Sequence, residues 1–205
     1  MIPSSCRLYL RSPSSFDPVA FRGLLEQALD AGDVAAFLLS MPEADEPTLR
    51  TAIQALAPLM RERDIALLLD GDPDVAIETD LDGVEIDCAL LSVRDVRKIM
   101  GDDRIVGAHA RSSRHLAMTA GEQSADYVAF YQDQEIVRWW ADMMEVPGAV
   151  DCADLSQTQK LVLAGTDFLR PGLSLWTCKD GPAAMVREIV AMIASIDTEE
   201  PELQL

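Results

Sequence analysis

Short apolar segments alternate with longer amphipathic segments along almost the whole chain, and this alternation limits the fold more than any other feature. Eight of the short segments are mostly apolar, as expected for strands of a parallel sheet that is buried on both faces. The predicted strands are Arg7–Arg11, Val34–Leu39, Ile65–Asp70, Gly83–Asp87, Ile105–His109, Tyr127–Tyr131, Gly148–Asp151 and Asp167–Arg170. The predicted helices, which lie between and after them, are Asp17–Leu29, Glu46–Glu62, Ser92–Met100, Ser113–Gln123, Glu135–Met143, Asp154–Leu163 and Ala183–Ile196.

Strands and helices that alternate in this way form β-α units, which build either an open doubly wound sheet or a closed barrel. No Gly-x-Gly-x-x-Gly pattern follows the first predicted strand, where a dinucleotide-binding sheet would carry it. Eight units close a barrel without remainder, and 205 residues lie near the lower end of the size range for that fold. We therefore predict an α/β protein with a single-domain (β/α)8 TIM barrel over residues 1–197 and an acidic tail over residues 198–205.

The chain is strongly acidic, with 35 Asp and Glu against 17 Lys and Arg and a formal charge of −18. This charge repels nucleic acid and anionic membranes, so we expect neither as a partner. Any site for an anion must therefore be built locally from basic side chains. Most of the acidic residues are equally explained as a solvated surface that keeps the protein soluble.

Two further features bear on the compartment. No apolar run approaches the roughly 20 residues of a membrane helix, and the first residues lack the basic and apolar layout of a signal peptide. The four cysteines are scattered without C-x-x-C spacing, which favours neither a zinc site nor a disulfide framework. We expect reduced thiols and a cytoplasmic location.

Several short segments occur in a characteristic order along the predicted strands. They are Leu8–Leu10, Leu67–Asp70, Asp74–Ala76, Asp82–Val84, Ile105–Gly107 and Ala125–Phe130. Each is weak alone, but together their order and spacing resemble the thiamine phosphate synthase family. The resemblance implies a barrel transferase of thiamine biosynthesis, often dimeric. Such an enzyme joins an aminopyrimidine pyrophosphate to a thiazole phosphate, and magnesium helps pyrophosphate to leave.

The chain also departs from the family pattern at the positions that carry this chemistry. The family ends its second strand with a Gln-x-Arg-x-Lys motif that contacts the pyrimidine and the pyrophosphate, and Phe37, Leu39 and Met41 stand there instead. Two positions that bind the metal through Asp in the family hold Gly71 and Leu90. Because negative charge builds up on a leaving pyrophosphate, the reaction needs such a cationic clamp. These departures argue against ordinary synthase activity.

Candidate functional residues are sought at the carboxyl ends of the strands, because barrels of this type carry their sites there. We call this end of the barrel the mouth. The predicted ligand-binding residues are Arg11, His109, Arg111, Tyr131, Asp151 and Arg170. Arginines can bind an oxyanion through paired hydrogen bonds, although salt bridges with the acidic surface are the alternative role. The carboxylates predicted to bind magnesium are Asp70, Asp72 and Asp87, and Glu85 on the same pair of adjacent strands could converge with them. Capping of helix starts would equally explain some of them.

The sequence predicts a divergent thiamine phosphate synthase-like barrel that binds a small phosphorylated or otherwise anionic metabolite. Whether the protein is an enzyme stays open. One alternative is an active synthase that works with magnesium and with relocated residues such as Arg11, Asp70 and Arg111.

The other alternative is a noncatalytic protein of regulation or assembly. A mouth filled by Phe37, Leu39 and Met41 would be evidence for it. The segment Trp139–Met144 is rich in Trp and Met, and an exposed part of it would support a homodimer.

Overall fold

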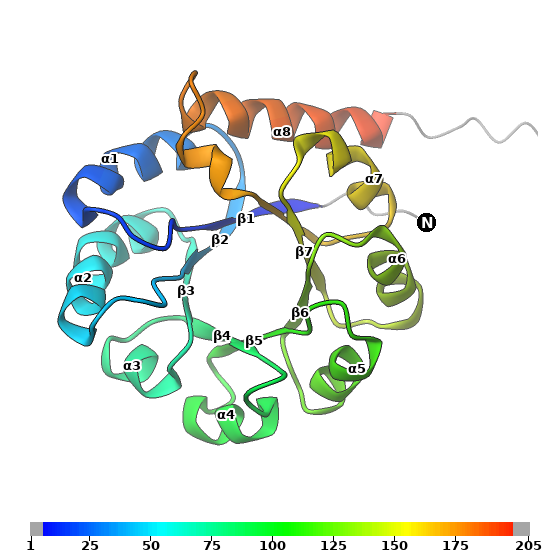
Figure 1. Cartoon of the computed structure of the whole chain (residues 1–205), viewed down its shortest axis with the longest axis horizontal. Helices are drawn as coiled ribbons and strands as arrows, with labels where there is room; N and C mark the ends of the chain where they lie inside the picture. The colour runs from blue at the N-terminus through cyan, green and yellow to red at the C-terminus, as the bar shows by residue number, and fades with distance from the viewer. Residues whose placement is uncertain (1–5, 199–205) are drawn as a thin grey trace, which may run out of the picture.

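The predicted barrel is confirmed. A computed structural model describes residues 6–198, and its parallel strands close into one barrel in the order β1 to β8 (Figure 1). The strands are β1 (Arg7–Arg11), β2 (Val34–Leu39), β3 (Ala66–Asp70), β4 (Gly83–Asp87), β5 (Ile105–His109), β6 (Tyr127–Phe130), β7 (Gly148–Cys152) and β8 (Phe168–Pro171). Each predicted strand is present, and its bounds differ by no more than one residue at either end.

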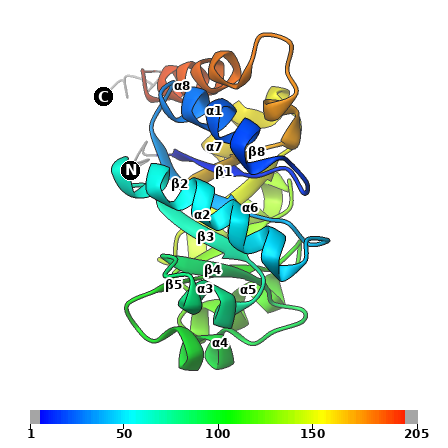
Figure 2. The same cartoon turned by 90° about the vertical axis from the view of Figure 1, so that its left-hand side faces the viewer.

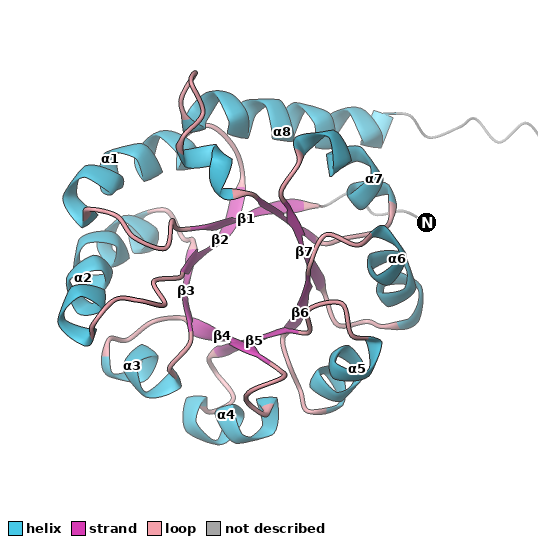
Figure 3. Cartoon of the chain, in the orientation of Figure 1, coloured by secondary structure: helices cyan, strands magenta, loops and turns pink. Residues whose placement is uncertain are grey.

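Helices surround the barrel on its outside (Figure 3). They are α1 (Pro18–Leu29), α2 (Glu46–Glu62), α3 (Pro73–Glu78), α4 (Val93–Met100), α5 (Arg114–Glu122), α6 (Gln134–Met143), α7 (Thr158–Leu163) and α8 (Pro182–Thr198). Short 3-10 turns at Leu155–Gln157 and Leu173–Trp176 precede α7 and α8. Helix α8 packs against both α1 and α7 and so closes the ring of helices (Figures 1 and 2). Among residues 6–198, no helix is both long enough and apolar enough for a membrane crossing.

Helix α3 is the helix that the sequence analysis did not predict. It spans six residues, which is too short to show a helical period. Its start is nevertheless marked, because Pro73 occupies an early helical position and the Asp72 carboxylate accepts a hydrogen bond of 2.9 Å from the backbone N–H of Asp74. Residues 199–205 of the predicted tail lie outside the described residues.

Aspartates begin four of the eight helices and the 3-10 turn before α7. The capping residues, whose carboxylates each accept a hydrogen bond from a backbone N–H of the first turn, are Asp17, Asp45, Asp72, Asp133 and Asp154. Such a cap contributes about 1 kcal/mol, and its negative charge also suits the positive end of the helix dipole. Part of the acidic excess therefore stabilises helix starts.

A second set of aspartates joins the strands at their amino ends, opposite the mouth. Each stands immediately before an even-numbered strand and accepts a hydrogen bond of 2.7 Å from a backbone N–H at the start of the preceding strand. The pairs are Asp82 with Leu67, Asp126 with Val106, and Asp167 with Gly148. Before β2, Asp33 instead binds the guanidinium of Arg7 on β1. In barrels of this type, the amino end contributes stability rather than chemistry.

The side chains of the strands form two layers, one under the helices and one inside the barrel. Strand β2 shows the alternation: Phe37 and Leu39 belong to the outer layer, whereas Leu38 belongs to the inner one. The ring of Phe37 lies 6.2 Å from that of Phe21 on α1, and Met41 also packs in the outer layer. These three apolar side chains therefore do not fill the mouth. A mouth filled by them would have favoured a noncatalytic protein, and the structure does not have this feature.

Helix α6 carries the aromatic segment considered for a dimer contact. Trp140 is buried, and its Nε1 donates a hydrogen bond of 2.8 Å to the carbonyl oxygen of Val146. Trp139 is half-buried beneath the guanidinium of Arg114, which lies 4.9 Å from the ring centroid. Met143 is 67% exposed. Core packing explains Trp140, and the homodimer stays a prediction.

Candidate functional site

The structure brings the predicted site residues to one end of the barrel, because all strands run in the same direction. The last residues of β1, β3, β4 and β5 are Arg11, Asp70, Asp87 and His109. The residues next to last in β7 and β8 are Asp151 and Arg170. The loops that leave the mouth contain Asp72, Arg111 and Tyr131.

A salt bridge crosses the interior of the barrel. Arg170 extends from β8, and its Nη1 donates to both carboxylate oxygens of Glu85 on β4, at 2.8 Å each. The two side chains are 1% and 4% exposed. A buried ion pair is stable only when further hydrogen bonds satisfy both partners, since both charges have lost their water. Asp151 and Tyr127 supply these further bonds.

Asp151 connects the salt bridge to His109. Its Oδ1 accepts a hydrogen bond of 2.5 Å from Nε of Arg170, and its Oδ2 lies 3.6 Å from Nε2 of His109. Because the backbone N–H of Arg111 donates to Nδ1 of His109, a neutral imidazole carries its proton on Nε2, facing Asp151. Burial alone would raise the pKa of Asp151. The charge of Arg170, the contact with His109 and the charge of Arg11 together lower it from 3.8 to about 2.

Two tyrosines complete the polar network inside the barrel. Tyr127 on β6 donates to Oε2 of Glu85 at 2.9 Å, and its hydroxyl oxygen lies 2.7 Å from that of Tyr9 on β1. Gly107 on β5 makes room for this arrangement, because a Cβ there would lie 2.1 Å from the ring of Tyr127. Burial first, and then the negative charge of Glu85, raises the pKa of both phenols well above the ordinary value. Both hydroxyls therefore remain neutral donors.

Two cationic groups of the network retain capacity for another partner. Nη2 of Arg170 is buried and has no hydrogen-bond partner in the described structure. The guanidinium of Arg11 is half-buried and makes no hydrogen bond or ion pair within residues 6–198, although its charge acts at longer range on Asp70 and Asp151. A buried donor without an acceptor costs about 1–3 kcal/mol, so Nη2 is the atom that most needs one.

Arg111, by contrast, already has a carboxylate partner. Its Nε and Nη2 lie 3.2 and 2.5 Å from Oδ2 of Asp87. Arg111 adopts a left-handed backbone conformation, with φ at +57°, which is uncommon for a residue other than glycine. The ring of Tyr131, which is 51% exposed, lies 4.7 Å from that of His109. An anion could bind Arg111 only in competition with Asp87.

The three carboxylates predicted to bind magnesium each have another partner. Asp70 accepts a hydrogen bond of 2.6 Å from the hydroxyl of Ser40, Asp72 caps α3, and Asp87 binds Arg111. Throughout the described part of the chain, no three His, Cys, Asp or Glu side chains are grouped so that they could hold a metal ion. The residues as arranged do not fit the magnesium ion that the family resemblance implies.

The network includes Tyr9, Ser40 and Tyr127, which were not predicted as site residues, and Glu85, which was considered only as a carboxylate for a cation and not as the partner of Arg170. The signal that could have found them is the two-residue repeat of a strand, in which alternate side chains face the same way. Counting back two residues from the last residue of β1 and of β4 gives Tyr9 and Glu85. The sequence prediction used the strand ends but not this repeat.

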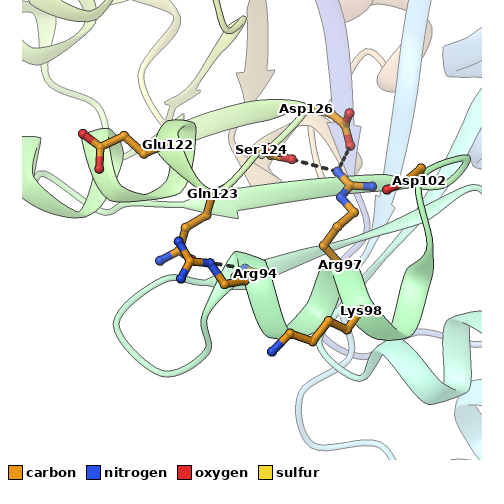
Figure 4. A pocket seen from close by; sticks show the side chains of 8 residues that line it. All are labelled: Arg94, Arg97, Lys98, Asp102, Glu122, Gln123, Ser124 and Asp126. Atoms are coloured by element: carbon orange, nitrogen blue, oxygen red, sulfur yellow. Dashed lines mark hydrogen bonds and ion pairs between the residues drawn. The ribbon is translucent and has the colours of Figure 1, made fainter.

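A pocket of about 520 Å³ lies away from the mouth, between α4 and α5 (Figure 4). Its lining residues are Arg94, Arg97, Lys98, Asp102, Glu122, Gln123, Ser124 and Asp126. Arg97 donates there to three backbone carbonyls and to the carboxylate of Asp126, and Lys98 is paired with Asp95. The basic side chain at the centre of this pocket thus joins α4 to the amino ends of β5 and β6, and we assign it no ligand.

Comparison with known proteins places these observations in a family. The family model described as thiamine monophosphate synthase matches residues 8–132, more than half of the chain. The thiamine-phosphate synthase of Rhodospirillum centenum is 41% identical over 199 residues, which cover 90% of this chain and 96% of the relative. That of Hyphomonas neptunium is 34% identical over 209 residues, covering 93% and 95%.

Solved structures agree on the fold. A thiamine phosphate pyrophosphorylase from Pyrococcus furiosus superposes with a TM-score of 0.82 at 18% identity, covering 94% of this chain and 98% of the other. An identity this low supports the fold alone. The family model and the sequence relatives carry the assignment further: the chain belongs to the thiamine monophosphate synthase family.

Proposed function

We propose that the protein binds a small phosphorylated or otherwise anionic metabolite at the mouth and does not carry out the ordinary synthase reaction. The observation that carries this proposal is Nη2 of Arg170, a buried cationic donor without an acceptor. Two carboxylates hold the guanidinium in place, so it loses little freedom when an anion binds. Arg11, which has no ion-pair partner among the described residues, adds a second positive charge near Asp151.

The argument against ordinary synthase chemistry comes from the charges. A pyrophosphate leaving group needs several positive charges around it. The inward-facing positions at the end of β2 are Leu38 and Ser40, so this strand supplies none. Arg111 is paired with Asp87, and Arg170 is paired with Glu85 and Asp151. Most of the positive charge at the mouth is thus already neutralised within the protein.

A second candidate function is an active thiamine phosphate synthase. The relative that is 41% identical over most of the chain bears that name, which favours this candidate. Catalysis would then use Arg11, Asp70 and Arg111. Magnesium would bind near Asp70, Asp72 and Asp87 after these side chains had released their present partners.

Two measurements separate the candidates. The protein is incubated with the aminopyrimidine pyrophosphate, the thiazole phosphate and magnesium, and the product is measured by chromatography. Robust turnover would refute the first candidate. In parallel, unfolding temperature is measured with phosphorylated metabolites, because a ligand at 100 times its Kd stabilises the folded state by about 2.7 kcal/mol. If no anion raises the unfolding temperature, the binding proposal fails.

Two broader parts of the prediction also remain proposals. We propose that the protein acts in the cytoplasm, on the basis of its four cysteines, which are scattered along the chain without C-x-x-C spacing. We also propose a homodimer that uses the exposed side of α6 around Met143. Sedimentation of the full chain at several concentrations tests the dimer, and a monomer at all of them would exclude it.

A further inference from the structure

The carboxylates of the network contact an arginine side chain and do not surround a common point at which their oxygens could bind a cation. Both oxygens of Glu85 accept from Nη1 of Arg170, and one of them also accepts from Tyr127. The oxygens of Asp151 face Nε of Arg170 and Nε2 of His109. The lone pairs of Glu85 and Asp151 that could bind a hard cation are therefore already directed at protein donors.

We propose that the anion site works without a divalent metal, and that the guanidinium of Arg170 supplies the fixed positive charge that magnesium held by carboxylates would otherwise supply. This inference rests on the proposed binding of an anion at the mouth. It differs from that proposal by naming the cation and by excluding a requirement for metal.

The chemistry of the two cations supports the assignment. Magnesium requires near-octahedral oxygen ligands at about 2.0–2.1 Å and keeps several waters. A guanidinium is permanently charged and planar, and it presents its donors in a fixed fork. In Arg170, Nε and Nη1 are used by Asp151 and Glu85, which leaves Nη2 as the remaining donor. The side chains inside the barrel thus hold the guanidinium of Arg170 in place and leave its Nη2 without a hydrogen-bond partner.

The geometry also indicates the class of ligand. One free guanidinium nitrogen on Arg170 and the unpaired guanidinium of Arg11 suit a single compact anionic group, such as a monophosphate or a carboxylate. A diphosphate chelated to a metal would bring more negative charge than these two groups offset, beside Asp70 and Asp151. We expect a monophosphate group to bind at least as well as a diphosphate.

Calorimetric titration of the full chain with inorganic phosphate and with inorganic pyrophosphate tests the inference. Each titration is done once with excess EDTA and once with excess magnesium chloride. We expect the Kd for phosphate to agree within about 3-fold between the two buffers, a difference of less than 1 kcal/mol. Titration with Mn²⁺ alone, followed by its paramagnetic resonance signal, should show no stoichiometric metal binding.

Variants identify the cation. Arg11→Met should weaken phosphate binding by at least about 10-fold, the scale expected for losing a bond to a charged group. Arg138→Met is the matched control, because it removes the same charge from an exposed position on α6 and should change the Kd by less than about 2-fold. The Arg170→Met single variant leaves Glu85 buried without its counter-ion and is expected to fold poorly.

The Glu85→Gln/Arg170→Met double variant removes both charges together and serves as the folded test of Arg170, with circular dichroism as the check on folding. It should lose phosphate affinity by at least about 10-fold in EDTA. Binding that needs magnesium overturns the inference and leaves the proposed function standing. Binding in EDTA that survives the double variant also overturns it. An absence of phosphate and pyrophosphate binding in both buffers refutes the proposed function itself, and the inference with it.

Discussion

The Arg170→Met substitution tests how strongly the buried salt bridge determines stability. It removes the counter-charge of Glu85, whose side chain is 4% exposed, and leaves Tyr127 as the remaining donor to that carboxylate. It also removes a partner from Asp151, which is 20% exposed and keeps its contact with His109. Breaking a buried pair by removing one partner costs about 3–5 kcal/mol. Because whole domains are stable by about 5–15 kcal/mol, we expect a large loss of folded protein on mild heating.

The double variant Glu85→Gln/Arg170→Met gives the second half of this test. It removes both charges and keeps an acceptor for the hydroxyl of Tyr127. Replacing both members of a buried pair is often close to neutral. We therefore expect the double variant to recover at least about 2 kcal/mol of the free energy of unfolding that Arg170→Met alone loses. Interaction energies of this size are measured in double-mutant cycles between residues in contact.

Urea unfolding, monitored by circular dichroism, measures both effects, with the exposed Arg138→Met as a control that should stay within about 0.5 kcal/mol of wild type. A loss of less than 1 kcal/mol for the single variant, or additive losses in the double variant, would refute the reasoning.

Substitutions at three further positions, two of them with a control variant, test other parts of the structure. The pKa of Asp151 falls from 3.8 to about 2 on folding, which contributes about 2 kcal/mol above pH 4 and is lost as the pH falls through 2. The stability difference between wild type and Asp151→Asn should shrink from pH 7 to pH 3, and a constant difference would contradict this. Gly107→Ala should destabilise by about 1–3 kcal/mol, because the new methyl group overlaps the ring of Tyr127, whereas Gly23→Ala in α1 meets nothing within 4 Å and should be neutral or stabilising. Asp126→Ala should cost about 1–3 kcal/mol, because it leaves the backbone N–H of Val106 without its acceptor and removes the carboxylate partner of Arg97. If Asp126→Asn, which keeps an acceptor, is equally destabilised in urea unfolding, this explanation fails.

The strands were predictable because a buried parallel strand needs apolar residues on both faces, and few other structures need short runs of this kind. Segments such as Val34–Leu39 and Gly83–Asp87 are bounded by polar or turn-forming residues, so their ends were clear. Helix α3 was missed because six residues contain fewer than two turns, and a hydrophobic period cannot be recognised over that length. Its capping aspartate, Asp72, was assigned to a metal site instead.

The positions of the site residues were predictable, but their pairing was not. Arg11 and Arg111 look alike in sequence, yet of the two only Arg111 forms an ion pair with a carboxylate within residues 6–198. Arg170 and Glu85 are 85 residues apart, and they meet because β8 and β4 face each other across the barrel. Whether a long side chain can cross that space depends on the sizes of its neighbours, such as the absent side chain of Gly107. Such information is distributed over several strands and has no local signal.

Part of the similarity to the family lies at the amino ends of the strands, opposite the mouth. Asp82 and Asp126 lie in segments that resemble the family, and both form hydrogen bonds that hold adjacent strands at the amino end. Such bonds are needed whatever reaction the barrel carries, since they satisfy backbone groups at the ends of strands. At the carboxyl end, Arg170 and its two carboxylates fill the interior with a fixed ion network. Similarity along the strands is therefore evidence for the fold. The proposed function of this barrel depends instead on whether an anion binds to Nη2 of Arg170.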